Sequence, residues 1–286
     1  MGNARARLSW TNNIAFRDTF FRAAVGIQKS GVNLLKLFPI FVVVGATCFC
    51  ELASERNVEL MRDASGHCDR ETFVIVLDVG HTPEAPGAIS ARGIPEYYFN
   101  LRLAEKIKGV LVARGFRKIY RLILHGGAES LVLRSGEAKR LHADLFLSIH
   151  HDSVQPQYLQ EWTFRGKKLY FDSRQSGFSL FVSLANPFAT KSLQFARFLG
   201  SELQNKGFRF SPHHAEQEAR TIIDAAGVYE YNDLYVLRTA SYPAVLLEAG
   251  VIVNPYEELR LETSELQLKI SNAVADAIQK FCESPE

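Results

Sequence analysis

The apolar positions between residues 71 and 286 follow two patterns. The segments FVIVLDV (73–79) and AVLLEAG (244–250) are continuous apolar runs, which are typical of strands buried on both faces. The segments KIYRLIL (118–124) and DLFLSIH (144–150) are similar, with shorter apolar stretches. The four segments therefore predict four strands of one central sheet.

Apolar residues at helical spacing separate these strands. Residues 96–114 carry such a pattern, which stops at Gly115, a residue suited to a helix C-terminus. Shorter helices are predicted over 135–142 and 193–203, and one long helix over 257–281. Strands that alternate with helices indicate an α/β fold, in which a mostly parallel central sheet is covered by helices on both faces. We expect residues 71–286 to form a single domain of this kind.

The first 70 residues have a different pattern. Six basic residues and one acidic residue, Asp18, precede the uncharged segment LFPIFVVVGATCFC (37–50). Its 14 residues are fewer than the roughly 20 that a membrane-spanning helix needs, and Pro39 interrupts them. We expect a signal peptide or an uncleaved anchor followed by a linker, and so an exported protein, periplasmic, cell-wall associated or membrane-anchored. A misplaced start codon and a core helix of the domain are the alternatives.

Composition and charge narrow the function classes. The 286 residues are 47% apolar, which suffices for a full core, and the net charge of +2 provides no basic face for nucleic acid. Cys48 and Cys50 lie in or beside the predicted signal. Cys68 and Cys282 stand far apart in the chain and do not suggest a disulfide framework, and no cysteine has zinc-finger spacing.

Four polar residues converge at one edge of the predicted sheet. His81 follows the first strand, His150 ends another, and Glu248 closes the strand that starts at Ala244. Ligands bind beyond the carboxyl ends of strands in such sheets, and Glu96 begins a helix whose preceding loop can return to that edge. Two histidines and two carboxylates there have the composition of a catalytic zinc site.

Each residue also has a structural explanation when it is taken alone. His81 could cap a turn, Glu96 could stabilise the N-terminus of its helix, and the pair His150 and His151 could form a solvated corner. Glu248 is harder to explain, because a carboxylate at the end of an apolar strand is costly to bury without a partner. The pair His213–His214 has no partners in register, and we interpret it as a surface feature.

Four sequence blocks then resemble a known family. LDVGHTPEAPGA, GIPEYYFNLRLA, LRSGEAKRLHADLFLSIHHDS and YPAVLLEAGVIVN resemble, in order and spacing, the blocks of the zinc-dependent N-acetylmuramoyl-L-alanine amidases of bacterial cell walls. The resemblance implies a zinc ion held by His81, Glu96 and His150, with Glu248 as the catalytic acid and base. It implies peptidoglycan as the substrate and allows a regulatory protein partner.

The chain departs from the family pattern at three positions. Tyr97 stands where a lysine is usual, Lys139 replaces an asparagine, and Val251 replaces an aromatic residue. None of these removes a ligand. A ligand exchange between His150 and His151, a zinc peptidase or deacetylase of the envelope, and a non-catalytic wall-binding module stay open as alternatives.

The stretch 154–234 is longer than the fold requires. Joining strand 144–149 to strand 244–247 through one strand and one helix takes roughly 40 residues, whereas 98 positions separate His150 from Glu248. We expect an insertion here that shapes the substrate groove or covers it. An acidic residue such as Glu216 or Glu218 could then occupy the open position of the zinc ion.

Overall fold

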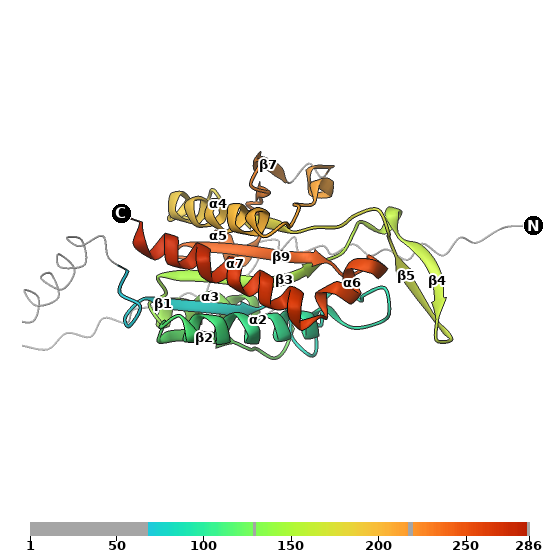
Figure 1. Ribbon diagram of the computed structural model, residues 1–286, viewed down its shortest axis with the longest axis horizontal. Coiled ribbons are helices and arrows are strands. Elements are labelled where there is room, and N and C mark those ends of the chain that lie inside the picture. Colours follow the sequence, from blue (N-terminus) through green and yellow to red (C-terminus); the bar gives the residue numbers. More distant parts are fainter. Residues whose placement is uncertain (1–67, 128–129, 217–219, 285–286) are drawn as a thin grey trace, which may run out of the picture. The chain divides into compact units, whose positions relative to one another are not determined.

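The computed structural model describes residues 68–127, 130–216 and 220–284, which contain a seven-stranded sheet (Figure 1). The strand order is β2-β1-β3-β9-β6-β8-β7. Pairing is parallel from β2 through β9 and between β6 and β8, and antiparallel between β6 and β9 and between β7 and β8. The mostly parallel sheet is confirmed. Its strands are β1 (Val74–Val79), β2 (Lys118–Leu122), β3 (Leu145–Asp152), β6 (Ser179–Val182), β7 (Thr221–Asp224), β8 (Val228–Glu230) and β9 (Ala244–Val251).

Helices cover both faces of this sheet, as predicted. One face carries α2 (Glu96–Ala113), α4 (Ala189–Asn205) and α7 (Ser264–Glu283), and the other carries α3 (Ser130–Arg140) and α5 (Tyr235–Arg238) (Figure 1). Alternate strand residues build the two cores, because successive side chains of a strand point to opposite faces. The smaller core lies under α3 and α5. On the same face of the sheet, the next alternate positions toward the carboxyl ends of the strands are polar.

The predicted long helix over 257–281 is wrong. The structure has two helices here, α6 (Pro255–Leu261) and α7, with a break at residues 262–263. The Asn254 side chain accepts hydrogen bonds from two backbone N–H groups of α6, and Thr263 accepts one from Leu266 N at the start of α7. Each helix therefore has its own N-cap, and the cap at Thr263 starts a second helix where the apolar spacing alone predicts one continuous helix.

The stretch 154–234 contributes to the sheet as well as to its surroundings. The hairpin of β4 (Gln160–Phe164) and β5 (Lys167–Phe171) follows the short 3₁₀ helix η1 (Pro156–Tyr158) and projects from the carboxyl end of the sheet (Figure 1). Strands β6, β7 and β8 extend the sheet itself. A second 3₁₀ helix, η2 (Pro212–Glu216), precedes β7.

A single disulfide joins Cys68 to Cys282, although their separation in the sequence does not suggest a disulfide framework. Although 214 positions separate them, packing of α7 beside the start of the domain brings their Cα atoms to 5.0 Å. The predicted signal or anchor, with Cys48 and Cys50, lies outside the described residues. Within the described ranges, no helix has the length and apolar character needed to cross a bilayer.

Candidate metal and catalytic site

His81 occupies a sharp turn directly after β1. Its φ is 67°, in the left-handed region that residues with a side chain rarely adopt. Arg134 of α3 stabilises this turn by donating hydrogen bonds to the carbonyl oxygens of Val79 and His81, both at 2.6 Å, and it also pairs with the buried Asp78. The left-handed conformation at His81 ends the strand. The turn, held by Arg134, places His81 at the carboxyl edge of the sheet.

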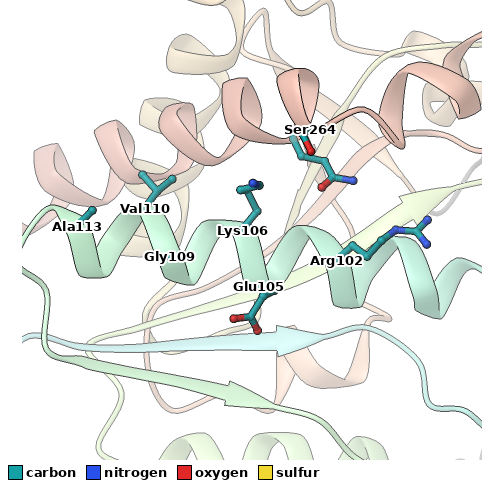
Figure 2. Close-up of a pocket in the computed structure, with 8 residues that line it drawn as sticks. Arg102, Glu105, Lys106, Gly109, Val110, Ala113 and Ser264 are labelled. Atoms are coloured by element: carbon teal, nitrogen blue, oxygen red, sulfur yellow. The ribbon is translucent and has the colours of Figure 1, made fainter.

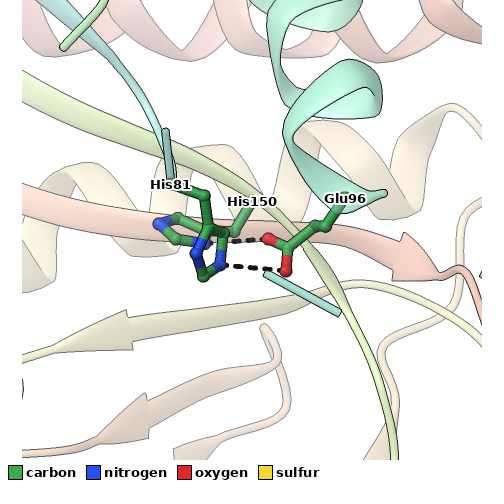
Figure 3. A group of neighbouring side chains, drawn as sticks. All are labelled: His81, Glu96 and His150. Atoms are coloured by element: carbon green, nitrogen blue, oxygen red, sulfur yellow. Dashed lines mark hydrogen bonds and ion pairs between the residues drawn. The ribbon is translucent and has the colours of Figure 1, made fainter. Parts of the chain in front are cut away.

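The Glu96 carboxylate connects the two histidines (Figure 3). Its Oε2 lies 2.9 Å from His81 Nε2, and its Oε1 lies 3.0 Å from His150 Nδ1. The backbone N–H of Ala88 donates to Oε2 at 3.1 Å, and the side chain of Asn100, one helical turn along α2, donates to Oε1 at 3.1 Å. The carboxylate is buried and held in one orientation from several sides.

The charges of this group stabilise each other. Burial alone would raise the pKa of Glu96, but the adjacent His81 and His150 outweigh burial and lower that pKa well below its usual range. Burial would likewise lower the pKa of His81, and the Glu96 carboxylate raises it instead. A carboxylate and two imidazoles this close together are a ligand set that suits a divalent cation.

Two glycines leave the space that this ligand set needs. A Cβ at Gly80 would lie 2.3 Å from His150 Nε2, and a Cβ at Gly87 would lie 2.4 Å from Glu96 Oε2. One potential ligand atom from each of His81, Glu96 and His150 lies within 4.8 Å of the others. Ligands about 2.0–2.1 Å from a tetrahedral zinc ion are roughly 3.3 Å apart, so the arrangement fits zinc with small adjustments.

His150, rather than His151, belongs to this group. His151 is buried on the opposite side of β3, where its Nδ1 lies 2.8 Å from Asn100 Oδ1 and its ring is 5.5 Å from that of Phe99. Burial lowers the pKa of His151 to about 3, so the ring stays neutral. The side chain supports Asn100, which in turn orients Glu96.

Glu248 lies beside His150 and accepts no hydrogen bond from the described residues. The two residues are register partners in the parallel pairing of β3 with β9. Glu248 Oε2 is buried and has no hydrogen-bond partner there. Burial, followed by the charges of Asp152 and Glu96, raises the pKa of Glu248 well above its usual range. A carboxyl group with a raised pKa and a free oxygen can accept and return a proton.

The interpretation of His213 and His214 as a surface feature is wrong. Both rings are buried, with residual exposures of 1% and 3%, and both approach Asp152. His214 Nε2 lies 2.5 Å from Asp152 Oδ2, and His213 Nε2 lies 3.3 Å from the same oxygen. Asp152 stands two residues after His150, so this second group adjoins the first. No local spacing signalled the contact, because it joins residues 62 positions apart.

The predicted cover of the site stays a prediction. Glu218 lies outside the described residues, and of Glu216 only the backbone, at the end of η2, is described. Beside this segment, Arg220 approaches His214 and is close enough to Glu248 to affect its pKa. No sequence pattern pointed to Arg220. The same is true of Arg134 and Asn100, which orient His81 and Glu96.

A separate groove lies between α2 and α7 (Figure 2). It is lined by Arg102, Glu105, Lys106, Gly109, Val110, Ala113, Ser264 and Gln267. These helices cover one face of the sheet, and α3 and α5 cover the other. Glu248 and His150 lie at strand positions on the face of α3 and α5. The groove is therefore distinct from the candidate site.

Comparisons with known proteins indicate one family. Residues 75–280 match the model of a family described as N-acetylmuramoyl-L-alanine amidase. The amidase AmiA of Escherichia coli (strain K12) is 28% identical over 256 residues, which cover 78% of this chain and 83% of AmiA. The crystal structure of the amidase Ami1 from Mycobacterium smegmatis matches with a TM-score of 0.56 and 21% identity, over 74% of this chain and 97% of Ami1.

A further solved structure contains a partner protein. The CwlD amidase from Clostridioides difficile, in complex with the GerS lipoprotein, matches with a TM-score of 0.54 and 21% identity, over 73% of this chain and 98% of CwlD. At 21% identity, the similarity to these two solved structures establishes the fold alone. The family match covers most of the chain, and the site lies inside it. The chain belongs to the N-acetylmuramoyl-L-alanine amidase family.

Proposed function

We propose that this chain hydrolyses the amide bond between N-acetylmuramic acid and L-alanine in peptidoglycan, with a zinc ion held by His81, Glu96 and His150. The observation that carries the proposal is the grouping of these three side chains, with one potential ligand atom from each within 4.8 Å of the others, and the unpaired Oε2 of Glu248 on the strand position beside His150. Membership of the family selects the bond, which the geometry alone does not specify.

The residues divide the chemistry between them. An amide is a weak electrophile with a poor leaving group, so its hydrolysis needs an activated water and a proton for the departing nitrogen. Zinc, when bound, supplies Lewis-acid chemistry that polarises a carbonyl and makes water a stronger nucleophile. Glu248 accepts the water proton at its free Oε2 and passes it to the amine nitrogen. Arg134 and Asn100 keep His81 and Glu96 in place during this cycle.

Two other activities use similar parts. A zinc peptidase or deacetylase of the envelope would use the same four residues, and only the product distinguishes it. A non-catalytic wall-binding module is disfavoured, because the candidate ligands and the carboxyl group of Glu248 are all present and placed together.

Purified peptidoglycan tests the proposal. After incubation with the protein, mass spectrometry should detect new free lactyl carboxyl groups on muramic acid and new alanine amino termini in equal amounts. New termini at other peptide bonds, or loss of acetyl groups, would identify the peptidase or the deacetylase instead. The Glu248→Gln variant serves as the inactive control.

We further propose an exported protein with a signal peptide or anchor within residues 1–70 and a catalytic domain over 71–286. The Cys68–Cys282 disulfide supports this, since disulfides persist mainly in oxidising compartments such as the periplasm. A regulatory protein partner is in keeping with the lipoprotein complex of the CwlD amidase. Fractionation of cells, with the disulfide trapped by alkylation, would test the location.

A further inference from the structure

The buried pair His213–His214 belongs to a network that ends in a charged side chain. Arg220 Nη1 donates a hydrogen bond to His214 Nδ1. A guanidinium group has only donors, so Nδ1 must be the acceptor, and the proton of the neutral ring lies on Nε2, directed at Asp152 Oδ2. Burial lowers the pKa of His214, which agrees with a neutral ring. Arg220, His214 and Asp152 thus form one oriented chain of hydrogen bonds.

This network is a poor site for a second cation. A metal ion on His214 would have to displace either the Arg220 guanidinium from Nδ1 or the proton that Nε2 shares with Asp152. His213 is also engaged, with its Nδ1 2.6 Å from Ser211 Oγ. A positive guanidinium group next to the ligands would repel the metal ion. The network instead fixes the direction of the Arg220 side chain.

The Arg220 guanidinium group has a donor without a partner among the described residues. His214 takes Nη1, whereas Nε is buried and has no hydrogen-bond partner among the described residues. The aromatic rings of Phe181 and Tyr231 hold the guanidinium group, with Cζ 5.3 Å and 4.7 Å from their centroids. The edge formed by Nε and Nη2 is the planar fork that binds both oxygens of a carboxylate.

The fork lies beside the reacting centre. Phe181 and Ser179 sit on β6, and Ser179 is the register partner of Glu248 on β9. Ser179 Oγ and Glu248 Oε2 are buried and, like Arg220 Nε, lack a hydrogen-bond partner in the described part of the chain. Arg220 packs on Phe181, two residues along β6 from Ser179, so its guanidinium group lies near the strand pair that carries Glu248. Two of these unpaired atoms belong to register partners on adjacent strands, and the third belongs to a side chain that contacts Phe181 on the same strand as Ser179. Such unpaired polar atoms are suited to a polar ligand.

We propose that Arg220, oriented by His214 and Asp152, binds a carboxylate of the peptidoglycan stem peptide and so positions the scissile amide beside Glu248. The inference rests on the proposed function for the identity of the substrate. The residue that follows L-alanine in a stem peptide carries a carboxyl group a few bonds from the scissile amide, and many bacteria convert that group to a carboxamide. Arg220 would prefer the charged form, and Asp152 and His214 are positioning residues.

Two ligands that differ at this one group test the proposal. They are N-acetylmuramoyl-L-alanyl-D-glutamate with a free α-carboxylate, and the same compound with an α-carboxamide. In both ligands the γ-carboxyl group is capped as a methylamide, so the α-carboxylate is the single carboxylate by which they differ. Binding of each is measured by calorimetry on the zinc-loaded Glu248→Gln protein, and cleavage of each is measured on the protein with Glu248. The binding measurement reports the preference for carboxylate even where neither ligand is cleaved, which would contradict the proposed function alone.

The expected result is a preference for the carboxylate of roughly 10- to 100-fold, which Arg220→Gln removes. Binding of the carboxamide should stay unchanged in that variant, and Arg220→Lys should keep part of the preference, because it retains the charge without the fork. His214→Gln should reduce the preference more than it reduces binding of the carboxamide. The matched control is Arg197→Gln, an exposed arginine on α4 that pairs with Asp224 and should leave the preference intact.

Three results would overturn the proposal. Equal binding of both ligands to the protein with Arg220 would show that no carboxylate site exists. An equal loss for both ligands in Arg220→Gln, with an unchanged melting temperature and zinc content, would show that Arg220 does not read the carboxylate. A second tightly bound zinc ion per chain, lost on His214→Gln, would assign the network to a cation.

Discussion

Gly80 leaves the space that the ring of His150 occupies. The backbone N–H of Gly80 donates to Ile149 O at 3.0 Å, so the end of β1 runs directly beside the end of β3. A Cβ built on Gly80 would lie 2.3 Å from Nε2 of His150, a distance that real side chains do not tolerate. The smallest residue of the turn after β1 therefore determines where a candidate zinc ligand can stand.

Substitution Gly80→Ala should weaken zinc binding by roughly 10- to 100-fold, because the methyl group must displace His150 from Glu96. Zinc affinity is measured by competition with a chelator. Gly109→Ala is the control, since nothing lies within 4 Å of its added Cβ on α2. The control should keep its zinc and gain about 0.5–1 kcal/mol of stability. Unchanged zinc affinity in Gly80→Ala would contradict this role.

The ligands themselves give a stronger effect. The parent protein should hold about one zinc ion per chain. His81→Ala and His150→Ala should each bind zinc more than about 100-fold more weakly, because two protein ligands and solvent replace three protein ligands. Metal analysis of the purified proteins measures the occupancy. His151→Gln should keep zinc better than either variant, since His151 contacts Asn100 and not Glu96 through its ring. Full occupancy in both alanine variants would rule out this ligand set.

Much of the site could be predicted from the sequence. Apolar runs mark the strands, and parallel strands bring their carboxyl ends to one edge, so His81, His150 and Glu248 had to approach each other. Glu96 could be added because its helix starts after the loop that follows β1. These inferences needed only local patterns and the geometry of a parallel sheet.

The supporting contacts could not be predicted in this way. Arg134 reaches Asp78 across 56 positions, and His214 reaches Asp152 across 62. Neither contact is linked to a periodicity, since each depends on how a helix or loop packs on a sheet edge. Cys68 and Cys282 likewise meet only because the last helix returns to the start of the domain. Two adjacent histidines in a polar segment gave no sign of burial.

Zinc affinity should fall as pH drops, beginning above the usual imidazole pKa. The Glu96 carboxylate outweighs burial and raises the pKa of His81 in the metal-free protein. A raised pKa means that His81 takes up its proton at a higher pH than free histidine, and a protonated imidazole cannot bind zinc. Chelator competition between about pH 5.5 and 8 measures the effect. His151, with a pKa of about 3, adds no proton in this range. An affinity that stays constant down to pH 6 would contradict the prediction.

The disulfide should stabilise the domain. It closes a loop of 214 positions, and its removal should cost about 2–5 kcal/mol and lower the melting temperature by roughly 5–15 °C. Cys68→Ala, Cys282→Ala and the double variant are compared by thermal unfolding. If the bond is responsible, the double variant should lose little more than either single variant, because each one already breaks the bond. Additive losses would assign the effect to packing of the two side chains.

Glu248→Gln should abolish turnover and leave zinc bound. The amide keeps the size of the side chain between His150 and Ser179 on the neighbouring strands but cannot accept the water proton, so kcat should fall by at least about 100-fold.

Removal of a buried carboxyl group with a raised pKa and an unpaired Oε2 should also increase the stability of the metal-free protein at neutral pH. The sign follows from the shift. A raised pKa in the folded state means that deprotonation disfavours folding above the ordinary pKa, and glutamine has no proton to lose. Amidase assays, metal analysis and thermal unfolding separate the outcomes. Near-normal activity would assign the base to another group, and parallel loss of zinc would make Glu248 a ligand.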